Sequence, residues 1–267
     1  MPFATNALDG SRIYFEDAGG EGDPVVFHGG FLDPVELVRE APLARELRKL
    51  PEEFRLSFVD HRGHGLSDKP HDPEAYAMPL RVADAIAVLD ALGIGSAHFI
   101  GISWGGRLGY GIGEHAPERV RSLVLIGQQP YAIDPEGPLA RLVGDAMAAS
   151  EEKGIEALVL AFESIVGRYP DRERGIYLAS DPAAMRAAWI TATAEGDLSE
   201  DLRSWDVRCL IYVAADDKDF FEQARRAAEE IPHAEFASAA GFDHLSMDTA
   251  DVDPVLPDVL RTLRSGR

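Results

Sequence analysis

The sequence contains very little cysteine: Cys209 is the only one among 267 residues. One thiol excludes an intramolecular disulfide, and its apolar neighbours predict a buried, inert side chain. No apolar run approaches the roughly 20 residues needed to cross a bilayer. The first residues also lack a basic stretch followed by an apolar one. We therefore expect no signal peptide and a cytoplasmic location.

Basic residues are scarce as well. Lysine and arginine total 26 against 46 acidic residues, which gives a formal net charge of −20. A nucleic-acid partner requires a basic surface that displaces counterions, and an anionic membrane surface attracts basic segments. We therefore expect neither a nucleic acid nor a membrane as a partner. The sequence leaves the oligomeric state open.

What the chain does contain is typical of a globular enzyme. Apolar residues make up 46% of the sequence and charged residues 27%, and the length suits one large α/β domain. Short apolar runs alternate with amphipathic stretches, which predicts a mostly parallel central sheet with helices on both faces. The expected strands cover residues 12–16, 25–27, 56–59, 97–102, 120–126, 209–214 and 235–237. The expected helices in this part cover residues 35–50, 79–92, 104–115, 219–230 and 254–263.

The alternation of strands and helices stops between residues 128 and 205. Three helical patterns fill this interval, at about 138–151, 154–167 and 181–195, so we expect an all-helical cap inserted into a core of residues 1–127 and 206–267. Apolar residues at helical spacing usually face a core. We expect most of the cap's large side chains to pack within it and some to line a substrate pocket: Tyr131, Met147, Phe162, Tyr169, Tyr177, Met185 and Trp189.

The strongest local pattern surrounds Ser103. Gly101, Ser103 and Gly105 form the pattern G-x-S-x-G, with an apolar run before it and a helical pattern after it. A serine on such a sharp turn projects its hydroxyl above the sheet, and glycine on each side removes the Cβ atoms that would collide. The pattern predicts a nucleophilic serine.

Other motifs extend this pattern along the chain. With them, the sequence resembles the α/β-hydrolase superfamily, in particular its single-domain serine hydrolases with a helical cap. The motifs are His28-Gly29-Gly30, the segment from Asp60 to Ser67 that reads DHRGHGLS, the Ser103 turn, and an aspartate and a histidine near the C-terminus in the right order.

The resemblance implies a catalytic triad of Ser103, Asp217 and His244. Asp217 follows the expected strand 209–214, but the glycine that family members often carry there is absent, so Asp216 is a competitor and Asp219 a more distant one. His244 follows the last short strand. The order serine, aspartate, histidine is that of this fold. In this scheme the histidine is the base and the aspartate holds its tautomer.

The resemblance also implies an oxyanion hole made of two backbone N–H groups. One belongs to Trp104, the residue after the nucleophile. The other belongs to Gly30, or to Phe31 if the loop is shifted by one residue. We also expect the bulky Trp104 ring to border the substrate pocket.

We expect no cofactor and no metal. His61 and His64 have a spacing that could begin a metal site, but the sequence offers no suitably spaced third or fourth ligand. The other histidines are expected to be structural or exposed.

A serine at the turn sets aside dehalogenases and epoxide hydrolases of this fold, which use aspartate there. The expected activity is hydrolysis of small, mostly uncharged carboxylic esters. Lactone or C–C bond hydrolysis with the same triad is the alternative. A cofactor-free non-hydrolytic enzyme or a non-catalytic ligand-binding protein is expected less.

Overall fold

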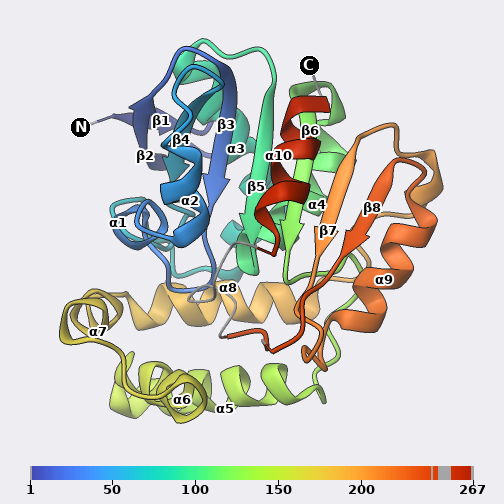
Figure 1. Cartoon of the computed structure of the whole chain (residues 1–267). Helices are drawn as coiled ribbons and strands as arrows, with labels where there is room; N and C mark the ends of the chain where they lie inside the picture. Colours follow the sequence, from blue (N-terminus) through green and yellow to red (C-terminus); the bar gives the residue numbers. More distant parts are fainter. Residues whose placement is uncertain (1, 242, 246–253, 266–267) are drawn as a thin grey trace.

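The computed structural model describes residues 2–241, 243–245 and 254–265. In this part of the chain an eight-stranded sheet has the order β1-β2-β4-β3-β5-β6-β7-β8 (Figure 1). β2 pairs antiparallel with β1 and β4, and every pair from β4 to β8 is parallel. The strands are β1 (Phe3–Thr5), β2 (Arg12–Gly19), β3 (Asp23–His28), β4 (Phe54–Val59), β5 (Ala97–Ile102), β6 (Val120–Ile126), β7 (Cys209–Tyr212) and β8 (Ala234–Ala237).

Helices cover both faces of the sheet, as predicted. One face packs against α3 (Met78–Leu92), α4 (Trp104–His115) and α9 (Phe221–Glu230), and the other against α1 (Val35–Val38), α2 (Pro42–Leu47) and α10 (Leu256–Ser265). Every residue of β5 is buried, because this central strand is covered from both sides. Two short 3₁₀ helices, η1 (Pro73–Tyr76) and η2 (Pro117–Arg119), complete this part.

The interval between β6 and β7 is helical and lies across the carboxyl ends of the parallel strands (Figure 1). It contains α5 (Pro138–Lys153), α6 (Glu156–Val166), α7 (Asp171–Leu178), α8 (Pro182–Ala194) and η3 (Leu202–Ser204). These helices share a small apolar cluster of their own, which Leu32 from the core joins. We call residues 128–205 the helical insert.

Two sequence predictions of helices were wrong. The stretch 35–50 is not one helix: it divides into α1 and α2, and Pro42 begins the second, because proline has no N–H for a continuing helical bond. The insert also has a fourth helix, α7, where three were expected. None of its residues is buried, so the sequence has no apolar stripe there to reveal it.

Several finer predictions were confirmed. Asp181 caps α8, since its side chain accepts from the N–H groups of Ala183 and Ala184 at 2.9 and 3.1 Å. α3 ends at Gly93, which has a φ of 68°. Cys209 is buried, and burial raises the pKa of its thiol to about 12. Among the described residues, no helix has both the length and the apolar character that a membrane span requires.

Candidate active site

Ser103 stands on a sharp turn between β5 and α4. Its backbone has φ 49° and ψ −105°, one of two positive φ angles at non-glycine residues in the described chain. A Cβ atom at Gly101 would lie 2.2 Å from the carbonyl oxygen of Gly105, and one at Gly105 would lie 2.4 Å from that of His28. Both neighbouring glycines are therefore required by close backbone contacts.

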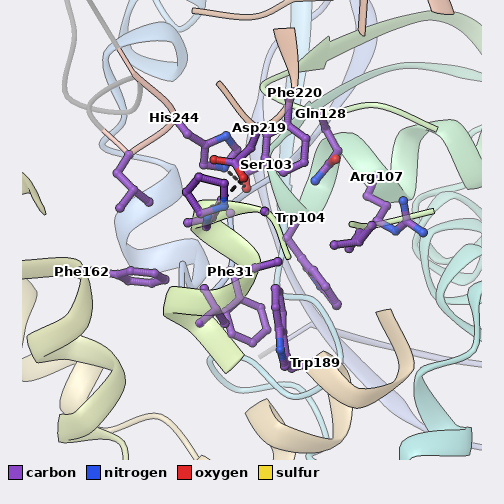
Figure 2. Close-up of a pocket in the computed structure, with 18 of the residues that line it drawn as sticks. Phe31, Ser103, Trp104, Arg107, Gln128, Phe162, Trp189, Asp219, Phe220 and His244 are labelled. Atoms are coloured by element: carbon purple, nitrogen blue, oxygen red, sulfur yellow. Dashed lines mark hydrogen bonds between the residues drawn. The ribbon is translucent and has the colours of Figure 1, made fainter. Parts of the chain in front are cut away.

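The fold brings Ser103, His244 and Asp217 together from three different loops. Figure 2 shows Ser103 beside His244. Ser103 Oγ lies 2.8 Å from His244 Nε2, and His244 Nδ1 lies 3.0 Å from Asp217 Oδ2. This is the hydrogen-bond order that a nucleophile, a base and an orienting carboxylate need.

Asp217 is held more firmly than its neighbours. Its side chain is fully buried, and its Oδ1 accepts from the N–H groups of Asp219 and Phe220 at 3.0 and 3.1 Å. Asp216 instead accepts from the N–H of Gly241. Of these two competing aspartates, Asp217 is the one that contacts His244.

Two further residues, Phe220 and Asp219, lie near the His244 imidazole. The Phe220 ring packs against the imidazole with 4.8 Å between centroids. Asp219 lines the cavity, and burial raises the pKa of its carboxyl.

Two unengaged backbone N–H groups stand near Ser103. The N–H groups of Trp104 and Phe31 make no hydrogen bond to any other described residue. The N–H of Gly30 differs, because it donates to Asp33 Oδ2 at 3.1 Å. Of the two candidates in this loop, Phe31 has the free N–H in this structure.

A cavity of about 220 Å³ opens beside Ser103 and lies between the sheet and the helical insert. Its aromatic border consists of Phe31, Trp104, Phe162, Tyr169, Tyr177, Trp189 and Phe220. The Phe31 ring joins the two tryptophans, with centroids 5.1 Å from Trp104 and 6.1 Å from Trp189 (Figure 2).

Four of the insert side chains that the sequence analysis named as candidates therefore line the cavity: Phe162, Tyr169, Tyr177 and Trp189. Met147 and Met185 are buried within the insert instead.

Polar groups occupy the opposite border of the cavity. Gln128 Oε1 accepts from the N–H of Gln129 at 3.0 Å, which leaves the side-chain NH₂ of Gln128 as a donor for a bound molecule. Arg107 also lines this border, and its fully buried side chain pairs with Glu195 at 3.4 Å. The site can thus offer hydrogen bonds as well as apolar contact.

Arg81 fixes Trp104 from behind the cavity. Its guanidinium lies 4.1 Å from the centroid of the Trp104 ring and donates to the Trp104 carbonyl at 3.4 Å. Burial is the main reason that the pKa of Arg81 falls to about 10.

Three histidines near this site are buried and are not part of it. His28 packs on His61 with 5.0 Å between ring centroids, and His61 packs on His64 with 5.5 Å. Burial lowers the pKa of His28 to about 3 and that of His64 to about 4. Within the described residues, no three His, Cys, Asp or Glu side chains cluster as a metal ion would need.

Sequence reasoning missed Asp33, Arg81 and Gln128. Asp33 precedes a proline, and an aspartate followed by proline is typical of a helix start. The sequence therefore does not indicate that the Asp33 side chain instead accepts from the Gly30 N–H. Arg81 lies in an ordinary amphipathic helix. Gln128 follows strand β6 at the sheet edge where Ser103 also lies, and this shared edge is the one signal that could have indicated it.

Comparisons with known proteins identify the family. The family model described as alpha/beta hydrolase fold matches residues 23–152. A non-heme haloperoxidase of Rhodococcus erythropolis is 30% identical over an alignment that covers 99% of this chain and 100% of that protein. The chain belongs to the α/β-hydrolase family.

Solved structures show the same fold for this α/β-hydrolase. An enol-lactonase from Burkholderia xenovorans LB400 superimposes with a TM-score of 0.80 at 21% identity, covering 98% of this chain and 100% of the other. An esterase from Exiguobacterium antarcticum gives 0.82 at 22% identity, covering 99% and 100%. By its family, this chain is an enzyme of the α/β-hydrolase type.

Proposed function

We propose that this α/β-hydrolase cleaves small, mostly uncharged carboxylic esters through an acyl-enzyme on Ser103. The observation that carries the proposal is the unbroken chain of hydrogen bonds from Ser103 Oγ through His244 to Asp217, at 2.8 and 3.0 Å. Buried carboxylate, imidazole and hydroxyl in this order are the parts that acyl transfer requires.

The proposed reaction has two halves. His244 Nε2 takes the Ser103 proton as Oγ bonds to the ester carbonyl carbon, and then gives the proton to the departing alcohol. A water molecule, deprotonated by His244, next attacks the acyl-enzyme and releases the carboxylic acid and free Ser103. Asp217 stays ionised throughout and keeps Nδ1 protonated.

The oxyanion of each tetrahedral intermediate needs two N–H donors. Trp104 N–H is one, since it lies at the start of α4 and makes no bond to a described residue. For the second we favour Phe31, because its N–H is free, whereas Gly30 would first have to leave Asp33. Removing one such donor typically costs about 3 to 4 kcal/mol of transition-state stabilisation.

The cavity supports a small substrate with apolar parts. Its aromatic border favours an acyl or alcohol group without charge, and Gln128 offers one donor to a carbonyl or ether oxygen. We propose that the helical insert, residues 128–205, acts as a lid, because four of its aromatic side chains form part of the border.

Lactones are the second candidate substrates. Structural neighbours include the enol-lactonase and an enzyme described as degrading N-acyl homoserine lactones. The same acylation of Ser103 would open a lactone ring, so the leaving alcohol would stay attached to the acyl group. A panel of p-nitrophenyl esters and lactones of graded chain length separates the two classes.

Ser103→Ala tests the proposal. Wild-type protein should release p-nitrophenol in a burst and carry an acyl group that mass spectrometry detects on Ser103, and the variant should lose turnover by several orders of magnitude. Asp217→Asn should lose far more turnover than Asp216→Asn. Full esterase activity in Ser103→Ala would disprove the mechanism, and a wild type that binds esters without turnover would favour a ligand-binding protein.

A further inference from the structure

A carboxylate that the proposed reaction does not use lies in the wall of the cavity. Asp33 lines the cavity beside Ser103 and also a second cavity behind the loop. It follows Gly30 and Phe31 in the loop of residues 29–34, which connects β3 to α1. Each of its two oxygens accepts a hydrogen bond from a different part of the molecule.

The first bond stays within the turn that carries the oxyanion donor. Asp33 Oδ2 accepts from the Gly30 N–H at 3.1 Å, and the Asp33 N–H donates to the Gly30 carbonyl at 3.2 Å. These reciprocal bonds close a turn in which Leu32 has a φ of 78°. A positive φ at a non-glycine residue costs on the order of 1–3 kcal/mol and persists only where neighbours enforce it. Asp33 is placed to enforce it.

The second bond joins this turn to the helical insert. The Tyr177 hydroxyl, on α7, donates to Asp33 Oδ1 at 3.0 Å. Tyr177 also lines the cavity, and its ring packs edge-on against Tyr169 with 4.9 Å between centroids. Asp33 therefore forms one bond to the helical insert and one bond within the turn.

The protonation of Asp33 suits two donors. Burial raises the pKa of this carboxyl to about 6, while the Tyr177 and Gly30 bonds oppose the rise. At neutral pH the group is therefore ionised, and an ionised carboxylate accepts at both oxygens. A neutral amide at this position would have to present an NH₂ to one of the two donors.

We propose that Asp33 is a positioning residue that links the docking of the helical insert, through Tyr177, to the geometry of the turn that supplies the second oxyanion donor. The inference rests on the proposed esterase function, because it acts on the transition state of that reaction. Asp33 itself forms no bond to the substrate in this scheme.

Three variants test the link: Asp33→Asn, Tyr177→Phe and the double variant. With a short p-nitrophenyl ester we expect kcat to fall about 10- to 100-fold in Asp33→Asn, with KM changed less than about threefold, because a displaced donor weakens the transition state rather than substrate binding. Tyr177→Phe should show a smaller loss of the same kind. The double variant should be no worse than Asp33→Asn alone, because both changes break one linkage.

An arylboronic acid supplies a second measurement. Its adduct with Ser103 places an oxygen where the oxyanion forms, so its inhibition constant should rise in parallel with the loss of kcat. Tyr14→Phe is the matched control: it also removes a hydroxyl bonded to a carboxylate, that of Glu16 at 2.9 Å, away from the cavity, and should change neither quantity.

The outcomes separate the two proposals. A wild type that neither turns over the ester nor acquires an acyl group on Ser103 would overturn the esterase function itself. A normal burst, combined with kcat and boronate inhibition within twofold of wild type in both single variants, would overturn the role of Asp33 alone. If Asp33→Asn does not fold, Tyr177→Phe decides the question, since it removes one hydroxyl and leaves the turn intact.

Discussion

Two loops leave neighbouring parallel strands at the same edge of the sheet, and they do different work. Residues 29–34 follow β3, and residues 60–67 follow β4. Each contains two glycines and belongs to a motif of the sequence resemblance. The first borders the cavity beside Ser103, whereas no residue of the second does.

Three polar side chains of the 60–67 loop, those of Asp60, Arg62 and Ser67, are bonded to the core. Asp60 accepts from the N–H groups of Val35 and Leu66 at 2.6 and 2.7 Å. Ser67 Oγ accepts from the Tyr14 N–H at 2.9 Å. These bonds connect α1 and β2 to the end of β4, so this loop has a structural role.

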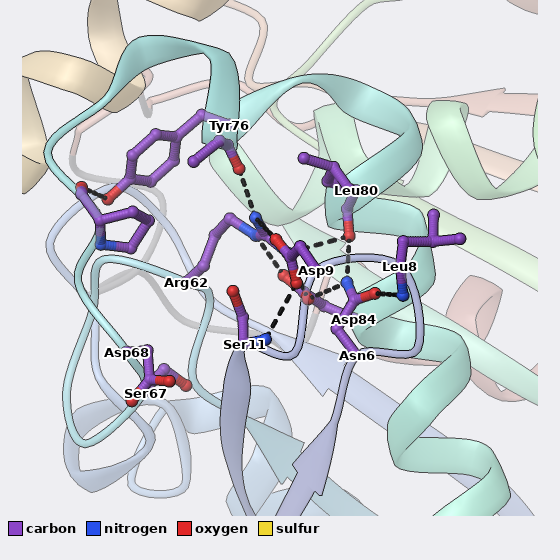
Figure 3. Close-up of polar contacts among 12 residues, drawn as sticks. Asn6, Leu8, Asp9, Ser11, Arg62, Ser67, Asp68, Tyr76, Leu80 and Asp84 are labelled. Carbon is purple, nitrogen blue, oxygen red and sulfur yellow. Dashed lines mark hydrogen bonds and ion pairs between the residues drawn. The ribbon is translucent and has the colours of Figure 1, made fainter.

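Arg62 is the central residue of a network of polar contacts around this loop (Figure 3). Its side chain is 1% exposed and pairs with Asp84 at 2.6 Å and with Asp9 at 2.9 Å. It also donates to the carbonyls of Ala75 and Leu80. The network joins the segment after β1, the 60–67 loop, η1 and α3.

The 29–34 loop differs in what it leaves unbonded. It holds Leu32 at a positive φ, and the N–H of Phe31 makes no bond to a described residue. The two loops therefore differ in their bonding: the 29–34 loop leaves the Phe31 N–H without a described acceptor beside the cavity, whereas the side chains of Asp60, Arg62 and Ser67 are bonded to the core. Residue type alone does not distinguish the two.

The largest expected effect is a loss of folding stability when Arg62 of the 60–67 loop is replaced, with the turnover number kcat unchanged. Arg62→Met removes the cation that pairs with Asp9 and with the buried Asp84, and removing one partner of a buried pair costs about 3 to 5 kcal/mol. Urea unfolding measures the loss. Because the 60–67 loop does not border the cavity, kcat per titrated active site should stay within about threefold of wild type. A tenfold fall in that kcat at full folding would show that the two loops are not separate.

A smaller effect concerns the histidines that lie between the loops. His28, at the end of β3, packs on His61 of the 60–67 loop, and the structure gives its ring nitrogens no partner among the described residues. Burial, with repulsion from Arg81, lowers the pKa of His28 from 6.5 to about 3. Above pH 6.5 the ring is neutral in both states. As the pH falls from 6.5 toward 3, only the unfolded chain takes up the proton, so stability is lost.

The loss from one such histidine between pH 7 and pH 5 is about 2 kcal/mol. His28→Leu should therefore reduce by about that amount the difference between the unfolding free energies measured at the two pH values. Asp33 has the opposite effect on stability, because its pKa is raised and the folded chain takes up this proton first as the pH falls. The His28→Leu variant leaves Asp33 in place, so the change in the pH difference reports His28 alone. An unchanged pH difference would mean that His28 is protonated in the folded chain.

The sequence predicted most of the architecture because seven of the eight strands in the described chain, all but β1, and most helices carry their own signals. Apolar runs, Gly93 and the Asp181 cap are local, and the structure confirmed them. The site was predictable where a motif names the residue, as at Ser103. The bonds of Asp33 and Tyr177 join residues 144 positions apart, so no local pattern contains them. α7 was missed because it has no buried face.

The smallest expected effect concerns Lys69, which lies two residues after the 60–67 loop and contacts its exposed edge. The Lys69 ammonium donates to the carbonyls of Gly65 and Ser67, the latter at 3.0 Å, from a partly exposed position. Water replaces these bonds when they are lost, so Lys69→Met should reduce the free energy of unfolding by less than about 1 kcal/mol. The same urea titration compares it with Arg62→Met, which removes the same charge from the buried side. A loss above about 2 kcal/mol would mean that the exposed edge supports the loop as strongly as its buried centre, and that burial is not what separates the two cations.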